Sequence, residues 1–176
     1  MDPINKSLHL SHEFVISCGT VTVDIKRSKV LLIRWRKTGE IMLPKGRKDR
    51  SERLEQTALR ETFEETGIHA QLLPVGIDTL ATPPPLVDAE GRREAATEPI
   101  ALSQRVDHQG ILKVIFWYVA EADSTVTPVD GTQQQDEDFE TIWEDFGNVT
   151  STLSFPDDQR IAQAAIGAIN KGVAHE

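Results

Sequence analysis

Three glutamates lie close together near the end of a helical stretch, where their negative charge is unfavourable. The segment 51–67 reads SERLEQTALRETFEETG, and Glu61, Glu64 and Glu65 fall in its last turns. A helix C-terminus carries a partial negative charge, so each carboxylate there costs about 0.3–1 kcal/mol. Like charges three or four residues apart repel by a further ~0.2–0.5 kcal/mol per pair. A bound cation would offset both costs, and such oxygen ligands favour Mg²⁺ or Mn²⁺.

The segment just before this helix is basic, although the chain as a whole has a formal net charge of −9. Its four cations are Lys45, Arg47, Lys48 and Arg50. Clusters of this kind bind phosphates. A basic loop beside a carboxylate metal site suits phosphoryl chemistry, because the metal bridges phosphate oxygens and activates water while the cations neutralise the remaining charge.

A helix over about 52–66 would carry the three glutamates. Ser51 is the expected N-cap, and Gly67 is the expected left-handed residue past the end. On a helical wheel the three carboxylates share an arc of about 100° and should form one exposed patch. Another side of the helix should pack on a sheet; its members are Ala58, Leu59, Thr62, Phe63 and Thr66.

The rest of the chain alternates between β-rich and polar segments. Strands are expected within 14–25, 28–35, 40–43, 69–82, 111–122 and 139–146. Segment 111–122 is apolar on both faces and should be a central strand. A last helix should begin at Pro156 and bury a stripe of Ile161, Ala165, Ala168 and Ile169. These elements predict an α/β sandwich with a single domain over 14–172, after a tail over 1–13.

Composition excludes several classes of protein. The net charge of −9 argues against a general nucleic-acid binder and against attachment to anionic membranes. No stretch approaches the ~20 apolar residues of a membrane span. Cys18 is the only cysteine, so no internal disulfide is possible, and its apolar surroundings predict a buried filler. A reducing, cytoplasmic location is expected; a leader removed from the chain would point to secretion instead.

The spacing of these residues resembles the Nudix box. Gly46, Glu52, Arg60-Glu61, Glu64-Glu65 and Gly67-Ile68 stand at its intervals, while Thr62 replaces the usual aliphatic residue. The resemblance implies the Nudix fold, a mixed β-sheet sandwiched between α-helices. It also implies a pyrophosphohydrolase that uses Mg²⁺, for which Mn²⁺ can substitute, to cleave a diphosphate linked to another group.

The resemblance assigns roles to the box residues. Glu61 and Glu65 would be the principal metal ligands, and Glu64 a further ligand or the base that takes a proton from water. Gly46 would offer its backbone carbonyl to a metal. Arg60 would orient the carboxylates by a salt bridge.

Two assignments stay open. Glu52 lies about half a turn away from Glu61 on a straight helix, so we expect it to contact Arg60 or a metal-bound water. The catalytic base could instead come from a loop, as in several relatives, and Glu137 and Glu140 are the candidates there.

The substrate is expected to be a small polyanionic phosphate compound. The sequence LPKG before the box is similar to diadenosine polyphosphate hydrolases and to diphosphoinositol polyphosphate phosphohydrolases, including fungal members of the second branch. Some of those are secreted and act inside a host cell. The basic loop favours inositol pyrophosphates, whose dense phosphates need many cations. Candidate substrate-binding residues are Lys45, Arg47, Lys48, Arg50, Arg34 and Lys113, with Arg92, Arg93 and Arg105 as extensions.

Dinucleoside polyphosphates and other nucleoside-diphosphate-linked compounds are the alternative substrates. An adenine would need an aromatic partner, for which Trp35 is the best placed; Trp117 and Tyr118 are expected in the core. A Nudix module that only binds its ligand is a third alternative, disfavoured because every box glutamate is present. The sequence leaves open whether the protein is a monomer or a dimer.

Overall fold

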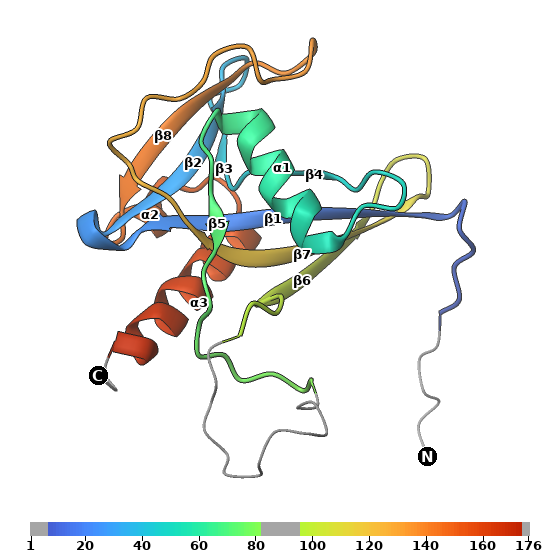
Figure 1. Ribbon diagram of the computed structural model, residues 1–176. Helices are drawn as coiled ribbons and strands as arrows, with labels where there is room; N and C mark the ends of the chain where they lie inside the picture. The colour runs from blue at the N-terminus through green and yellow to red at the C-terminus, as the bar shows by residue number, and fades with distance from the viewer. Residues whose placement is uncertain (1–6, 82–95, 174–176) are drawn as a thin grey trace.

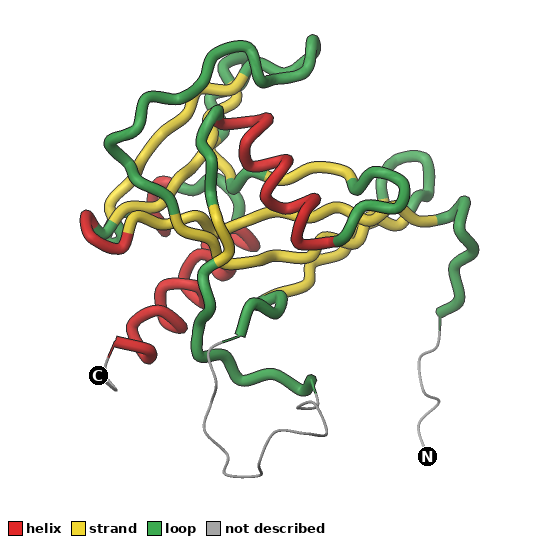
Figure 2. The backbone as a smooth tube through the Cα atoms, in the orientation of Figure 1, coloured by secondary structure: helices red, strands yellow, loops and turns green. Residues whose placement is uncertain are grey.

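The computed structural model describes residues 7–81 and 96–173. Figure 2 shows the helices, strands and loops of this part of the chain. The helices are α1 (Leu54–Thr66), α2 (Val149–Thr152) and α3 (Pro156–Val173), with a short 3-10 helix at Ile25–Arg27. The strands are β1 (Phe14–Asp24), β2 (Lys29–Trp35), β3 (Ile41–Met42), β4 (Lys45–Arg47), β5 (Gln71–Leu72), β6 (Ala101–Val106), β7 (Leu112–Glu121) and β8 (Phe139–Asp145).

The described strands form one mixed sheet with the order β3-β2-β1-β7-β5 (Figure 1). Strand β4 pairs with β1, β6 with β7, and β8 with β2. The central pair, β1 and β7, is parallel from Phe14 opposite Leu112 to Val23 opposite Glu121, and the other pairs are antiparallel. Segment 111–122 is therefore the central strand that its apolar residues predicted.

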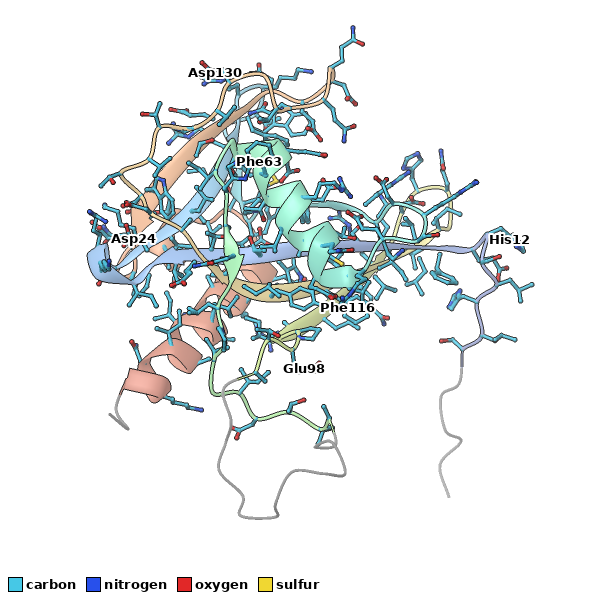
Figure 3. All side chains as sticks on the ribbon, in the orientation of Figure 1. His12, Asp24, Phe63, Glu98, Phe116 and Asp130 are labelled. Carbon is cyan, nitrogen blue, oxygen red and sulfur yellow. The ribbon has the colours of Figure 1, made fainter. Side chains whose placement is uncertain are left out.

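Helices cover both faces of the sheet, as the α/β sandwich requires. Because side chains alternate along a strand, β1 serves two cores. Val21 and Val23 face the larger core, which α3 closes, and Cys18 packs with Ala58 of α1 on the other face. In Figure 3, Phe116 lies beside the first turns of α1 and Phe63 near its end. The described residues contain no helix long and apolar enough to cross a membrane.

Several expectations about the core are confirmed. Helix α3 begins at Pro156, and the four residues of its predicted stripe are buried. Trp117 and Tyr118 are buried, and so is Cys18. Burial raises the pKa of the Cys18 thiol to about 11, which keeps it protonated and unreactive.

The local boundaries differ from expectation around the box. Helix α1 begins at Leu54 after Arg53, and Ser51 is not its N-cap but adopts a left-handed conformation with φ of 62°. The predicted basic loop begins as strand β4, because Lys45–Arg47 pairs with Ser17–Gly19. Phe63 is only partly buried; its ring stacks on His69 at 4.0 Å instead of packing on the sheet.

Other segments were assigned incompletely. The described part of segment 69–82, residues 69–81, contributes only the two-residue β5 and a bridge from Val75 to Ala96. Strand β6 and helix α2 were not expected. Arg92 and Arg93 lie outside the described residues.

Candidate active site

Strand β4 lies against helix α1 and covers two of its three glutamates. A β-carbon at Gly46 would overlap the Glu61 carboxylate, and the Lys45 N–H donates to Glu65 Oε2 at 2.8 Å. Glu61 and Glu65 are each only 4% exposed, whereas Glu64 remains partly exposed. The expectation of one exposed patch was therefore wrong for two of the three, because Lys45–Arg47 forms a strand beside the helix and not an open loop.

Burial shifts the pKa of these two carboxyl groups. Removal from water disfavours a charged carboxylate, and this raises the pKa of Glu65 to about 8 and that of Glu61 above its ordinary value. The charge of Lys45 opposes the rise at Glu65, and Arg60 opposes it at Glu61. The negative charge of Glu137 adds to the rise at both.

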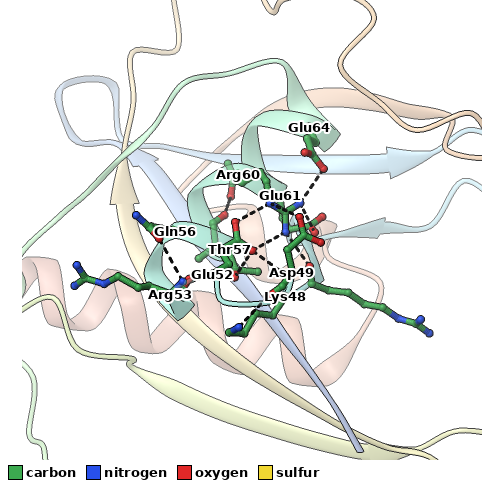
Figure 4. A network of polar contacts seen from close by, with 12 residues as sticks. Lys48, Asp49, Glu52, Arg53, Gln56, Thr57, Arg60, Glu61 and Glu64 are labelled. Atoms are coloured by element: carbon green, nitrogen blue, oxygen red, sulfur yellow. Dashed lines mark hydrogen bonds and ion pairs between the residues drawn. The ribbon is translucent and has the colours of Figure 1, made fainter. Parts of the chain in front are cut away.

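Arg60 connects the acidic groups around α1, as Figure 4 shows. Its Nε and one terminal nitrogen donate to Glu52 at 2.8 and 3.0 Å. Its other terminal nitrogen donates to Glu61 at 2.8 Å and to Glu64 at 3.0 Å. The expected contact between Glu52 and Arg60 is thus present, while the catalytic roles of both stay predictions. These contacts lower the pKa of Glu52 to about 2, chiefly through the hydrogen bonds from Arg60.

Glu52 also joins the basic loop to the helix. Its carboxylate accepts from the Asp49 N–H at 3.1 Å and from the Thr57 hydroxyl at 2.7 Å. The Arg47 carbonyl in turn accepts from Arg60 at 2.9 Å. The loop that carries the cations is therefore fixed to the same guanidinium that holds the glutamates.

The carbonyl groups at the C-terminal end of α1 accept hydrogen bonds from the segment that leads into strand β8 and from β8 itself. The last four carbonyls of a helix have no partner within it, and carboxylates nearby would add to their negative charge. Here each of four successive carbonyls accepts one hydrogen bond. The pairs are Thr132 Oγ1 to Glu64 O (2.8 Å), Gln133 Nε2 to Glu65 O (3.1 Å), Thr141 Oγ1 to Thr66 O (2.8 Å) and Val129 N to Gly67 O (2.9 Å).

The two candidate loop acids have different surroundings. Glu140 forms an ion pair with Arg34 at 2.9 Å, which also engages that candidate substrate-binding cation. Glu137 is partly buried, and its carboxylate accepts from the Gln134 N–H at 3.0 Å. The negative charge of Glu137 acts on both Glu61 and Glu65.

The cations predicted to bind the substrate do not all lie in one place with their charges free. Arg47 and Arg50 are exposed, and neither has a carboxylate partner among the described residues. Lys48 Nζ donates to the Asp49 carbonyl at 2.8 Å. Lys113 lies on β7 with its Nζ 3.9 Å from Asp107, so its charge is already balanced there.

A cavity of about 630 Å³ adjoins the site, and sequence reasoning did not predict it, although it named three of the lining residues, Trp35, Lys45 and Arg105, as candidates. Lys45 connects the two, because it lines the cavity and its N–H donates to the Glu65 carboxylate. Asp158 is buried in the wall, accepts from the Leu43 N–H at 3.0 Å and has its pKa raised by burial. The other lining residues include Glu40, Met42, Trp117, Phe155 and Asp157.

The donor set suits a hard divalent cation. In the part of the chain that is described, no three carboxylates, imidazoles or thiols converge as a ready coordination cluster. Arg60 instead bridges Glu61 and Glu64. Glu61 shares Arg60 with Glu52 and Glu64, and Glu65 forms no ion pair with the described residues. Oxygen ligands of this kind fit Mg²⁺ or Mn²⁺.

A family model described as the NUDIX domain matches residues 16–164. The chain therefore belongs to the Nudix domain family.

Solved structures show the same fold. An Ap4A hydrolase from C. elegans superposes with a TM-score of 0.60 at 16% identity, over 90% of this chain and 98% of that one. A NUDIX hydrolase from Nitrosomonas europaea gives 0.58 at 14%, over 88% and 89%. A NUDIX-family hydrolase from Clostridium perfringens gives 0.57 at 19%, over 92% and 99%. At such identities the likeness is one of fold.

Proposed function

We propose that this Nudix hydrolase is a Mg²⁺-dependent pyrophosphohydrolase of small, multiply phosphorylated compounds. The observation that carries the proposal is the burial of Glu61 and Glu65 against β4, where Glu65 forms no ion pair with the described residues and Glu61 shares Arg60 with two other carboxylates. When bound, the metal supplies Lewis-acid chemistry toward phosphate oxygens and water. In this proposal Glu61, Glu64 and Glu65 supply the carboxylate ligands, and Gly46 supplies its backbone carbonyl.

In this proposal, Arg60 keeps the ligands in place and a nearby carboxylate accepts the proton of the attacking water. Glu137 is the preferred base, because its hydrogen bond comes from a backbone N–H and not from a guanidinium. Glu64 shares Arg60 with Glu61, so its carboxylate is already engaged by a guanidinium. Glu64 then serves as a ligand.

Inositol pyrophosphates are the proposed substrates. Arg47, Lys48 and Arg50 stand on the segment that Glu52 and Arg60 fix beside the acidic site. None of the three has a described carboxylate partner within salt-bridge distance. Their charges are therefore available for a dense shell of phosphates.

Dinucleoside polyphosphates are a second candidate, favoured by the cavity beside Lys45. Trp35 and Phe155 give it aromatic surface for a base, and Glu40 and Asp158 would repel a densely phosphorylated ring. One of the structural neighbours is named an Ap4A hydrolase.

A competitive panel with Mg²⁺ tests both candidates. It offers 5-diphosphoinositol pentakisphosphate, diadenosine tetraphosphate and ADP-ribose at matched concentration to the wild type and to two variants. Arg47→Glu/Lys48→Glu should impair the inositol compound most, while Trp35→Ala should impair the dinucleotide most. Inositol pyrophosphates would be ruled out as the preferred substrate if the dinucleotide were hydrolysed faster than the inositol compound and only Trp35→Ala removed that activity. If none of the three compounds is hydrolysed, both substrate assignments are contradicted.

A further inference from the structure

The side-chain amide of Gln133 forms three hydrogen bonds, all to backbone groups around the active site. Its Oε1 accepts from the Phe139 N–H at 2.8 Å, and its Nε2 donates to the Phe139 carbonyl at 2.9 Å. The second N–H of the same Nε2 is available for the Glu65 carbonyl, 3.1 Å away. The side chain thus pairs with Phe139 as a neighbouring strand would, and it joins that pair to helix α1.

Both partners of Gln133 are firmly held. Phe139 is buried at the start of β8, and its ring meets Trp35 edge-on with the centroids 5.1 Å apart. Glu65 is 4% exposed and accepts from Lys45 through its side chain. The Gln133 amide therefore fixes the distance between the end of helix α1 and the start of strand β8.

Gln133 also closes the loop that carries Glu137. Residues 134–138 span the interval between Gln133 and Phe139, so the hydrogen bonds between those two residues seal the base of the loop. Within it, the Glu137 N–H donates to the Gln134 carbonyl, and the Gln134 N–H donates to Glu137 Oε2, each at 3.0 Å. The position of the Glu137 carboxylate therefore depends on the point at which the loop is closed.

We propose that Gln133 is a positioning residue, which fixes the loop acid Glu137 relative to the metal-ligand turn at Glu65. The inference rests on the proposed function, in which these two carboxylates act on the same phosphoanhydride. No other described side chain hydrogen-bonds both the helix end and the base of this loop.

Independent contacts keep the surrounding fold in place without Gln133. Thr141 Oγ1 and the Val129 N–H satisfy neighbouring carbonyls of α1. The Arg36 N–H donates to the Asp138 carbonyl at 3.0 Å and holds the entry to β8. Loss of the amide should therefore disturb geometry more than folding.

The test compares Gln133→Met with Gln135→Met, a matched control because Gln135 is exposed and its side chain forms no hydrogen bond with the described residues. Misplacement of catalytic groups by about 1 Å costs on the order of 10²-fold, so Gln133→Met should lower kcat by about 10- to 100-fold with KM little changed. Mn²⁺ binding, followed by EPR, should weaken in Gln133→Met and stay at the wild-type value in Gln135→Met. Wild-type kcat and Mn²⁺ affinity in folded Gln133→Met would overturn the proposal.

A second comparison separates positioning from simple loss of stability. In a Glu137→Gln background, Gln133→Met should cost much less in kcat than it does alone, because the group it places is already gone. If the reduction of kcat in the double variant equals the product of the reductions in the two single variants, the proposal is contradicted. Gln133→Asn, which keeps the amide but shortens the side chain, replaces Gln133→Met if that variant does not fold. If the wild type cleaves no phosphoanhydride, the proposed function fails, and unchanged Mn²⁺ binding in the variant then overturns this inference separately.

Discussion

Gly46 lies so close to the carboxylate of Glu61 that no side chain fits between strand β4 and helix α1. A glycine here is required for close approach and not for a special backbone angle, since its φ is not among the positive values of the chain. The buried position of Glu61 therefore depends on a residue fifteen places earlier in the sequence.

Gly46→Ala should inactivate the enzyme while leaving it folded. The added methyl group displaces the Glu61 carboxylate, whose side chain can rotate away. A shift of about 1 Å in a catalytic group costs on the order of 10²-fold, so kcat should fall by roughly that factor. Steady-state kinetics with circular dichroism as the folding control measures this, and wild-type kcat in the alanine variant would contradict the placement of Glu61.

The stability of the metal-free protein should fall as pH rises from about 4.5 to about 8. Glu65 has its pKa raised from 4.5 to about 8 by burial, so in this range the folded state holds a proton that the unfolded state has lost. The free energy of unfolding therefore decreases as pH rises, until Glu65 is ionised in both the folded and the unfolded state. Urea unfolding in EDTA at pH 5, 6.5 and 8 measures it, and Glu65→Gln should flatten the dependence.

The same shift predicts that metal binding releases a proton from Glu65 below pH 8. Divalent ions bind the ionised carboxylate, so affinity for Mn²⁺ should increase as pH rises toward 8. Calorimetry in two buffers of different ionisation enthalpy gives the number of protons released. A heat independent of the buffer at pH 6.5 would show that Glu65 is ionised before the metal arrives.

Arg60→Lys should impair catalysis although it keeps the charge. The guanidinium donates to three carboxylates and one carbonyl in a fixed planar geometry, which an ammonium group cannot reproduce. Loss of one stabilising contact in an active site commonly costs on the order of 10²-fold in kcat, and we expect a fall of that size. The same variant should raise the apparent pKa of Glu52, detected by carboxyl NMR titration.

Thr20→Val should destabilise the protein without changing turnover per folded molecule. Thr20 Oγ1 lies 2.7 Å from both Thr22 Oγ1 and Thr62 Oγ1, and all three side chains are buried. Leaving buried hydroxyls without that partner costs about 1–3 kcal/mol. Urea denaturation measures the loss; an unchanged midpoint would show that the remaining contacts, such as Thr62 to the Ala58 carbonyl, are sufficient.

These hydroxyls also explain the one departure from the Nudix box. Thr62 occupies an aliphatic position of the motif, and the strand opposite presents Thr20 and not a hydrophobic residue. The sequence located Thr62 on the packing face but could not show its partner, because the two residues are far apart along the chain.

Periodicity was sufficient for the elements whose determinants are local. The α3 stripe and the apolar run of β7 each repeat within a few residues, and both were predicted correctly. The burial of Glu61 and Glu65 was not, because it depends on β4 pairing with β1 rather than on the helix itself. The cavity beside Lys45 likewise joins segments far apart in the chain, which no short motif encodes.

The parallel pairing of β1 with β7 has a consequence for how the enzyme is made. The whole Nudix box lies between these two strands in the sequence, and a growing chain emerges from the ribosome in order. The sheet centre that supports the box cannot close until β7 has been synthesised. A nascent chain that ends before residue 112 should thus bind Mg²⁺ weakly, even though every box glutamate is already present. Pairing of strands so far apart in the sequence also favours slow folding.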